Sequence, residues 1–577
     1  MQLLGRLLNC IFKYISKLIN KSINFDNSYE KTLKAGKNRS LIIKGVVWTV
    51  YSIISLKIVL IGGFPNDIYT KKPSYAPKKT ITRESIYDRN GTLVADFLNS
   101  DGLYVNPKMV KDAKLLQHQL LEIFPNMNPD KLYKKLTRKA RFVWLVRRLT
   151  PKQKYSVNAL GDISLNFIKA KTRIYPHENL MSHILGYVNV DNIGVSGIEK
   201  KFDKKLSELE KPVHLTIDAR IQYILRSEIL KMMKLTSAIG GTGIVMDVTN
   251  GEVIAMTSLP DFDPNHPNKG RKNFLNKATH AVYELGSTFK IINSAIALES
   301  KKVSIRDVYD ATKPIKIGKF VINDYHAQKK ILSVPEIFIH SSNIGSIKMI
   351  MDVGTKIQKE KMQELNLLEP LDIILPERAK TIYPKYWRKT ETATISYGHG
   401  ISVSPLHLVS AIGAVVNGGT YYKPLFIKDQ IAEGRTVFSS KTSRQVRKLM
   451  RYNTTNGSGK LTNVQGYLVG SKTGTAEKPK NGGYDKKALI SSLVASFPMH
   501  NPKYIVYILI DEPQPSPITN NLRPTGGWVG APVAAKVIEQ IAPILDIYPV
   551  DENNPAIKRA MKIPPPKNTK TKINGQI

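Results

Sequence analysis

A serine and a lysine three residues apart are the most reactive pair in this sequence. Ser287 and Lys290 lie in the stretch Tyr-Glu-Leu-Gly-Ser-Thr-Phe-Lys, and apolar residues at helical spacing follow through Leu298. We therefore expect a helix that begins at Ser287, with Lys290 one turn later on the same face. The positive end of the helix dipole favours an oxyanion near Ser287 and disfavours an ammonium at Lys290. A neutral Lys290 could then accept the Ser287 proton and activate the serine as a nucleophile.

Two further motifs follow this pair in the chain. Alone, the Ser-x-x-Lys spacing is also compatible with a helix cap followed by an exposed lysine. Ser341–Asn343 reads Ser-Ser-Asn, and Lys472–Thr475 reads Lys-Thr-Gly-Thr. In this order, Ser-x-x-Lys, Ser-x-Asn and Lys-Thr-Gly are the motif set of β-lactamases and penicillin-binding proteins. The three motifs together predict acyl transfer through a serine ester.

Composition indicates a multidomain globular protein. The chain has 577 residues, of which 42% are hydrophobic and 23% charged. Its net charge of +40 could indicate nucleic-acid binding, but the lysines are spread along the whole chain and no nucleic-acid-binding motif is present. We therefore expect contact with an anionic membrane or polymer, and no nucleic-acid partner. The single cysteine, Cys10, excludes an intramolecular disulfide.

No motif predicts a metal or a cofactor. The sequence lacks a phosphate-binding glycine loop of the Walker type. His177, His183 and Glu199 could suggest a metal site, but nothing supplies the remaining ligands at the usual spacing. We therefore expect neither a metal ion nor a cofactor.

The N-terminal part predicts a membrane anchor. Residues 1–44 would be cytoplasmic, and residues 1–22 form either an amphipathic membrane-surface helix or an ordinary docking helix. Residues 45–64 are close to the ~20 apolar residues that span a bilayer. Lys57 lies near enough to the far end to extend towards the interface. The basic residues before the apolar segment place the N-terminus in the cytoplasm: Lys31, Lys34, Lys37, Arg39 and Lys44. Residues 65–80 then form a linker.

Two folded regions are expected after the linker. Residues 81–210 begin with a hairpin around Asn90-Gly91 and form a mixed module. Residues 211–548 contain a hairpin at Asn250-Gly251 and buried strands at 489–497 and 504–510. Apolar helical stretches lie between them, near 291–298, 337–351 and 405–416, so the fold class is α+β with a sheet packed against a helical subdomain. We expect residues 549–577 to form a disordered tail.

The chain resembles the class B penicillin-binding proteins over most of its length. The three motifs, the single anchor and two longer stretches, 175–199 and 395–406, carry the resemblance. These two stretches are most similar to the septal type, which acts in cell division. The resemblance implies a pedestal module and a transpeptidase domain held at the bacterial inner membrane. It also implies D-Ala-D-Ala stem peptides as substrates, β-lactams as inhibitors, and a membrane glycan polymerase with other division proteins as partners.

The resemblance assigns roles to the motif residues. Ser287 would attack the D-Ala-D-Ala carbonyl, with Lys290 as general base and the backbone N–H groups of Ser287 and Thr475 as oxyanion hole. An amine of a second stem peptide would then resolve the acyl-enzyme. The other assigned residues shuttle protons, position the substrate or bind its carboxylate: Ser341, Asn343, Lys472, Thr473, Gly474 and Thr475.

Other functions share some of these features. A bifunctional class A synthase would need a glycosyltransferase domain, for which residues 65–210 are too few. A β-lactamase would lack the anchor and the module, and would turn over a chromogenic β-lactam rapidly. Two further alternatives are an elongation-type transpeptidase and a division scaffold that has lost its catalytic activity. Growth of cells carrying Ser287→Ala would support the scaffold.

Overall fold

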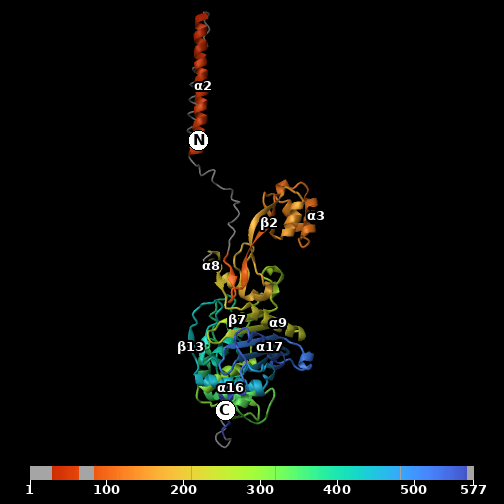
Figure 1. The fold of residues 1–577 in the computed structure, drawn as a ribbon, viewed down its shortest axis with the longest axis vertical. Coiled ribbons are helices and arrows are strands. Elements are labelled where there is room, and N and C mark those ends of the chain that lie inside the picture. The colour runs from red at the N-terminus through yellow and green to blue at the C-terminus, as the bar shows by residue number, and fades with distance from the viewer. Residues whose placement is uncertain (1–28, 64–82, 209–210, 319, 481–482, 568–577) are drawn as a thin grey trace. The chain divides into compact units, whose positions relative to one another are not determined.

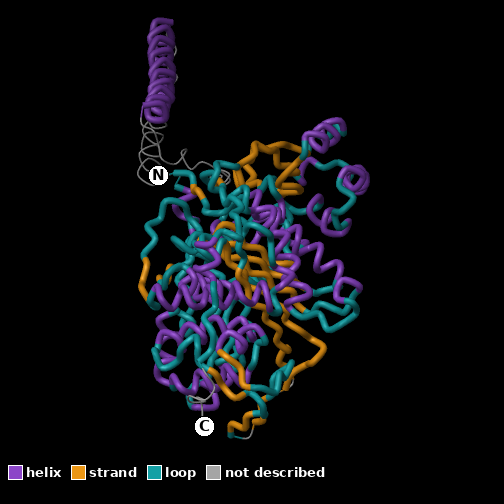
Figure 2. Tube along the Cα trace, turned by 60° about the horizontal axis from the view of Figure 1, so that its bottom comes forward, coloured by secondary structure: helices purple, strands orange, loops and turns teal. Residues whose placement is uncertain are grey.

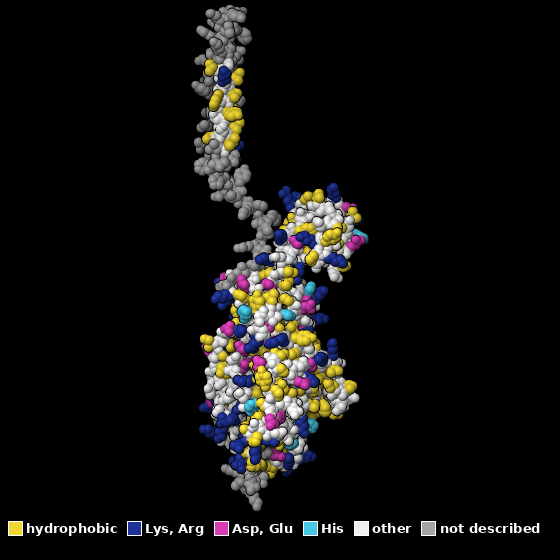
Figure 3. Space-filling view, in the orientation of Figure 1, with side chains coloured by type: hydrophobic (Ala, Val, Ile, Leu, Met, Phe, Trp, Pro, Cys, Tyr) yellow, Lys and Arg dark blue, Asp and Glu magenta, His cyan; other side chains and the backbone are white. Residues whose placement is uncertain are grey.

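The computed structural model describes residues 29–63, 83–208, 211–318, 320–480 and 483–567, in two compact units that divide between Lys79 and Thr80. Unit 1 contains the helix α2 (Tyr29–Gly63). Its stretch Ser40–Ile58 is exposed, and is long and apolar enough to cross a membrane. Much of the described surface of α2 is correspondingly hydrophobic (Figure 3). The segment 1–22 and the linker 65–80 lie outside the described residues.

Unit 2 begins with a module built on a five-stranded sheet. The strand order is β3-β2-β1-β5, with β4 paired to β2. The predicted Asn90-Gly91 hairpin is confirmed, because it joins β1 antiparallel to β2. The bounds are β1 (Ile86–Tyr87), β2 (Leu93–Val105), β3 (Val143–Leu149), β4 (Leu165–Ile174) and β5 (Val213–His214).

Short helices cover the two ends of this sheet: α3 (Ala113–Ile123), α4 (Pro129–Leu136), α5 (Pro151–Ala159), α6 (Ser182–Leu185), α7 (Gly197–Lys201) and α8 (Asp203–Ser207). The first three share a small core with β2 and β3, at the end of β2 that projects from the rest of unit 2 (Figure 1). At the other end, the buried carboxylate of Glu199 pairs with Arg83 at 2.9 Å and Arg173 at 2.7 Å. Glu199 is thus an ion-pair residue that holds the module together.

The second sheet of unit 2 lies at the centre of the larger domain. Its antiparallel order is β14-β15-β16-β6-β7. The predicted Asn250-Gly251 hairpin and the two predicted buried strands are confirmed as the β6/β7 turn, β15 and β16. The bounds are β6 (Gly240–Asp247), β7 (Val253–Leu259), β14 (Gly470–Lys480), β15 (Gly483–Phe497) and β16 (Tyr504–Asp511). Alternate residues of β16 belong to the cores on the two opposite faces, so the strand is apolar throughout.

Helices cover both faces of this sheet (Figure 2). One face packs against α9 (Ala219–Leu235) and α17 (Gly526–Ile541). The other packs against α10 (Phe289–Glu299) and α15 (Pro405–Val416), the centre of a helical subdomain. The remaining elements of this subdomain are α11 (Val334–Ile339), α12 (Asn343–Val353), α13 (Thr355–Glu364), α14 (Lys389–Ile395), α16 (Ser440–Asn456), β8 (Val308–Asp310), β9 (Ile315–Ile317), β10 (Phe320–Ile322), β11 (Ile331–Ser333), β12 (Thr420–Tyr422) and β13 (Gly434–Thr436).

Two expectations about this domain need correction. The helical stretch at 337–351 is divided between α11 and α12, and the break contains Ser341. The tail is not wholly disordered, because α18 (Pro555–Met561) follows the domain and Lys567 pairs with Asp307 at 2.6 Å. Apolar side chains from this segment also pack on the main core. Residues 568–577 lie outside the described part.

Candidate active site

The first motif is built into the core of the larger domain. Ser287 lies in the 3-10 turn η5 (Gly286–Thr288), which leads directly into α10. Every residue of α10 from Phe289 to Leu298 is buried, whereas Ser287 is only half-buried. The turn therefore presents the serine at the surface of a helix that is otherwise enclosed.

Lys290 is enclosed with that helix rather than exposed. Its side chain is 2% exposed. The amine donates hydrogen bonds to the carbonyl oxygen of Ser341 at 2.5 Å, to Ser341 Oγ at 3.1 Å and to Asn343 Oδ1 at 2.8 Å. The three hydrogen bonds of the Lys290 amine thus join the first motif to the second.

Lys472 from the third motif completes the group. This side chain is fully buried, and its amine donates to the same Ser341 Oγ at 3.1 Å. Burial lowers the pKa of Lys472 to about 7. Burial and the nearby Lys472 amine lower the pKa of Lys290 well below its ordinary value, while Asp324 acts in the opposite direction. A neutral amine next to a shared hydroxyl can accept and pass on a proton.

An acid that belongs to none of the three motifs positions the second motif. Ser341 has a left-handed backbone with φ +55°, which brings its carbonyl and side chain together at the α11–α12 break. Asp324 accepts hydrogen bonds from Ser342 Oγ at 2.7 Å and from the backbone N–H of Asn343 at 2.5 Å. It also accepts from the next N–H of α12, so its charge lies at the positive end of that helix. Asp324 could not be predicted from the sequence, since no spacing rule links it to Ser341.

The third motif lies on β14, at an edge of the central sheet. A Cβ at Gly474 would lie 2.6 Å from Ser492 Oγ and 2.8 Å from the Leu285 carbonyl, so only glycine lets this strand approach the Ser287 turn. Thr475 Oγ1 accepts a hydrogen bond from the Gly526 N–H at the start of α17, at 3.2 Å. The edge of β14 and the Ser287 turn therefore lie against each other.

A second cluster that the sequence did not predict supports the Ser287 turn. Glu284 accepts hydrogen bonds from Gly400 N at 2.9 Å and Tyr484 Oη at 3.3 Å, and His399 Nδ1 lies 3.2 Å from its other oxygen. Burial opposes the charge on Glu284, but these partners outweigh it and lower its pKa. The cluster thus joins the Ser287 turn to the 397–400 loop and to the β14–β15 hairpin.

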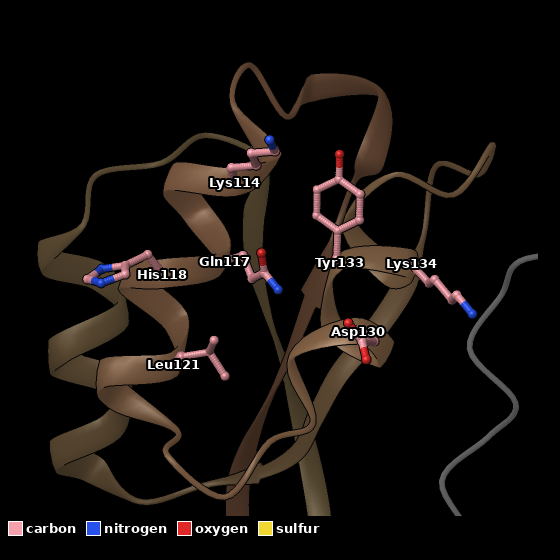
Figure 4. A pocket seen from close by; sticks show the side chains of 7 residues that line it. All are labelled: Lys114, Gln117, His118, Leu121, Asp130, Tyr133 and Lys134. Carbon is pink, nitrogen blue, oxygen red and sulfur yellow. The ribbon is translucent and has the colours of Figure 1, made fainter.

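The motif residues form one group in three dimensions. Lys290, Ser341, Asn343 and Lys472 are connected by hydrogen bonds, and Ser287 with Thr473–Thr475 borders them. A separate hollow of 560 Å³ lies between α3 and α4 in the module, and none of its residues belongs to a motif (Figure 4): Lys114, Gln117, His118, Leu121, Asp130, Tyr133 and Lys134.

Comparison with known families gives two matches along the chain. Residues 241–539 match the penicillin-binding protein transpeptidase domain. Residues 78–227 match the penicillin-binding protein dimerisation domain. The two matched regions correspond to the larger domain and to the module described above.

Individual relatives are similar over most of their length. A probable peptidoglycan D,D-transpeptidase FtsI from Caulobacter vibrioides is 36% identical over 82% of this chain and 83% of its own. The FtsI D,D-transpeptidase of Escherichia coli is 26% identical over 81% and 84% of the two chains. A peptidoglycan synthetase from Bifidobacterium adolescentis has a similar fold, with a TM-score of 0.64 at 20% identity over 83% of this chain and 98% of its own.

Proposed function

Because the chain belongs to the penicillin-binding protein transpeptidases, in the class B group of FtsI-type peptidoglycan D,D-transpeptidases, we propose that Ser287 is its acylated residue. The observation that supports this assignment is the buried group around Ser341 Oγ, to which Lys290 and Lys472 both donate beside the Ser287 turn. A hydroxyl between two lysines with lowered pKa values suits proton transfer to and from a serine ester.

Acylation starts with the hydroxyl of Ser287. Its oxygen attacks the carbonyl between the two D-Ala residues while its proton moves to neutral Lys290. The backbone N–H groups of Ser287 and Thr475 stabilise the resulting oxyanion. Ser341, between the two lysines, returns a proton to the departing D-Ala amine. The C–N bond breaks, and the acyl group remains on Ser287.

Crosslinking reverses these steps with a different amine. The amine of a second stem peptide attacks the ester, loses its proton through Ser341 and Lys290, and frees the serine. Asn343 holds the substrate amide, and Thr473–Thr475 lines the opposite wall of the cleft. Thr475 holds the substrate carboxylate in the field of Lys472 when that lysine is charged.

Unit 1 and the relatives support the membrane setting of this proposal. The apolar helix Ser40–Ile58 serves as a single anchor, with a cytoplasmic N-terminus and unit 2 outside the inner membrane. The FtsI naming of the relatives supports a role in septal wall synthesis. In that role a membrane glycan polymerase and other division proteins are its partners. The boundaries near residues 81, 211 and 548 separate the module, the catalytic domain and the tail.

Intact-mass spectrometry with benzylpenicillin tests the assignment of Ser287. We expect one stable adduct on the wild-type protein and none on Ser287→Ala. Ser294→Ala, in the buried body of the same helix, is the matched control and should still form the adduct. Folded wild-type protein without an adduct would contradict the proposal and favour a scaffold. An adduct that disappears within seconds would indicate a hydrolase.

A further inference from the structure

An ion pair lies where the two walls of the site meet, and the mechanism above does not use it. Arg523 Nη2 lies 2.7 Å from Glu477 Oε1, and its guanidinium carbon is 5.4 Å from the centre of the Tyr325 ring. The two charged side chains are 32% and 30% exposed, so water and solutes reach them.

Each of the three residues is joined to a catalytic element. Tyr325 directly follows Asp324, which positions the second motif. Glu477 is two residues beyond Thr475 on β14. Arg523 lies three residues before Gly526, whose N–H donates to Thr475 Oγ1. The pair is therefore part of the cleft rim, on the side where β14 continues beyond the third motif.

The pair can exchange partners at low cost. A partly exposed ion pair contributes little to stability, because water solvates both charges when it opens. The neighbouring Lys478 differs, since it lies 2.5 Å from Asp511 Oδ1 and 2.7 Å from Glu512 Oε1. Asp511 is 4% exposed, so Lys478 is tied to a buried carboxylate, although Lys478 and Glu512 are themselves 25% and 30% exposed. Arg523 and Glu477 are consequently charges at this end of β14 that an arriving ligand can engage without disturbing a buried carboxylate.

The register of an edge strand indicates which part of a substrate reaches them. An extended peptide can pair with the free edge of β14, and residues two apart in a strand lie about 6.8 Å apart on one face. With the terminal D-Ala carboxylate at Thr475 and antiparallel pairing, the residue before D-Ala-D-Ala lies opposite Glu477. That residue is the one whose side chain varies between stem peptides.

We propose that Glu477 and Arg523 determine specificity by binding an α-aminocarboxylate on that side chain, which rests on the function proposed above. Glu477 binds the ammonium and Arg523 binds the carboxylate, for which its planar fork of N–H groups is suited. Adjacent charges of opposite sign match a zwitterion. A side chain with an ammonium alone would bind Glu477 and leave Arg523 without its carboxylate partner.

The test compares two donors with the full-length protein in detergent. The donors are pentapeptides ending in D-Ala-D-Ala that carry either diaminopimelate or lysine before it, with one acceptor amine held constant. We expect the wild-type kcat/KM to favour the diaminopimelate donor about tenfold or more, the size of one charge-assisted hydrogen bond. Arg523→Gln and Glu477→Gln should each lower this ratio about tenfold. Arg89→Gln, which opens an ion pair with Glu252 at 3.3 Å and comparable exposure, should leave the ratio unchanged.

The possible results separate this proposal from the assignment of Ser287. Benzylpenicillin lacks the zwitterion, so adduct formation reports the catalytic group alone. Equal kcat/KM values for both donors in the wild type would overturn the specificity proposal, as would an equal loss on both donors in the two variants. Absence of the benzylpenicillin adduct would instead overturn the function on which it rests.

Discussion

At the scale of single residues, the proposed chemistry depends on two buried lysines. Lys290 and Lys472 are 2% and 0% exposed, and both donate to Ser341 Oγ at 3.1 Å. Burial disfavours the charged form of both amines, and the charge of Lys472 additionally lowers the pKa of Lys290. A lysine of ordinary pKa would be protonated at neutral pH and could not act as a base. The burial of α10 therefore supports the proposed role of Lys290 as the base.

The pH dependence of acylation tests this interpretation. Lys290 must be neutral to act as base, so the benzylpenicillin acylation rate should rise with pH through a pKa well below that of ordinary lysine. Lys472 must be charged to hold the substrate carboxylate, so the rate should fall as pH passes about 7. Stopped-flow acylation kinetics between pH 5 and pH 10 should give a bell-shaped profile.

Replacing Lys472 with a residue that stays charged provides the control for the falling limb of this profile. Lys472→Arg keeps a cation above pH 7, because arginine remains protonated. The falling limb of the profile should move to higher pH in this variant, while the rising limb stays in place. A falling limb that is the same in both proteins would show that another group titrates there.

At the scale of elements, close backbone contacts set the site geometry. The 397–400 loop lies against the Ser287 turn, where Gly286 N donates to the Gly398 carbonyl at 3.2 Å. Gly398 has φ +81°, and a Cβ there would lie 2.1 Å from the Gly286 carbonyl oxygen. No side chain can fit between the two segments. The position of Ser287 therefore depends on a glycine more than 100 residues away in sequence.

Gly398→Ala should displace the Ser287 turn. We expect the benzylpenicillin acylation rate to fall at least about tenfold, since small misplacements of reacting groups have large kinetic effects. Gly418→Ala is the matched control, because Gly418 also has positive φ, +113°, but no atom lies within 4 Å of the place that an alanine methyl group would take. Backbone strain of about 1–2 kcal/mol lowers the stability of both variants. Similar acylation rates in the two would show that the contact with Gly286 is unimportant.

At the scale of the whole molecule, the anchor and the catalytic unit are separate. Thr80–Ile577 forms its own compact unit, and all the motif residues lie within it. Among the described residues, both of its sheets pack against clusters of buried hydrophobic side chains. Its exposed Lys and Arg side chains are distributed over the visible face rather than gathered in one stripe (Figure 3). This distribution fits a general affinity for anionic surroundings.

Removal of residues 1–79 should leave acylation intact. We expect the shortened protein to form the benzylpenicillin adduct within about twofold of the full-length rate, because the catalytic group lies wholly within unit 2. Stopped-flow kinetics on both forms, with circular dichroism to compare folding, would check this. A shortened protein that folds but acylates much more slowly would show that unit 1 acts on the site.

Local patterns predicted much of this molecule. Asn-Gly turns between apolar runs predicted both hairpins, and helical spacing after Ser287 predicted α10. The helix α16 was not predicted, although Ser439 and the apolar spacing of Val446, Leu449 and Met450 are typical of a capped amphipathic helix. It also predicted continuous helical character at 337–351, where the left-handed Ser341 instead divides two helices.

The sequence by itself determined the motif set, the order of its members and the apolar anchor segment, because spacing along the chain decides local geometry and hydrophobicity. Only the tertiary structure decided that Asp324 supports the second motif, that Glu284 and His399 support the Ser287 turn, and that Arg523 meets Glu477. These pairs are separated by many residues, and no local pattern encodes them. The lowered pKa values of the two lysines likewise depend on burial, and that of Lys290 also on the charge of Lys472, and both effects arise only when distant segments pack together.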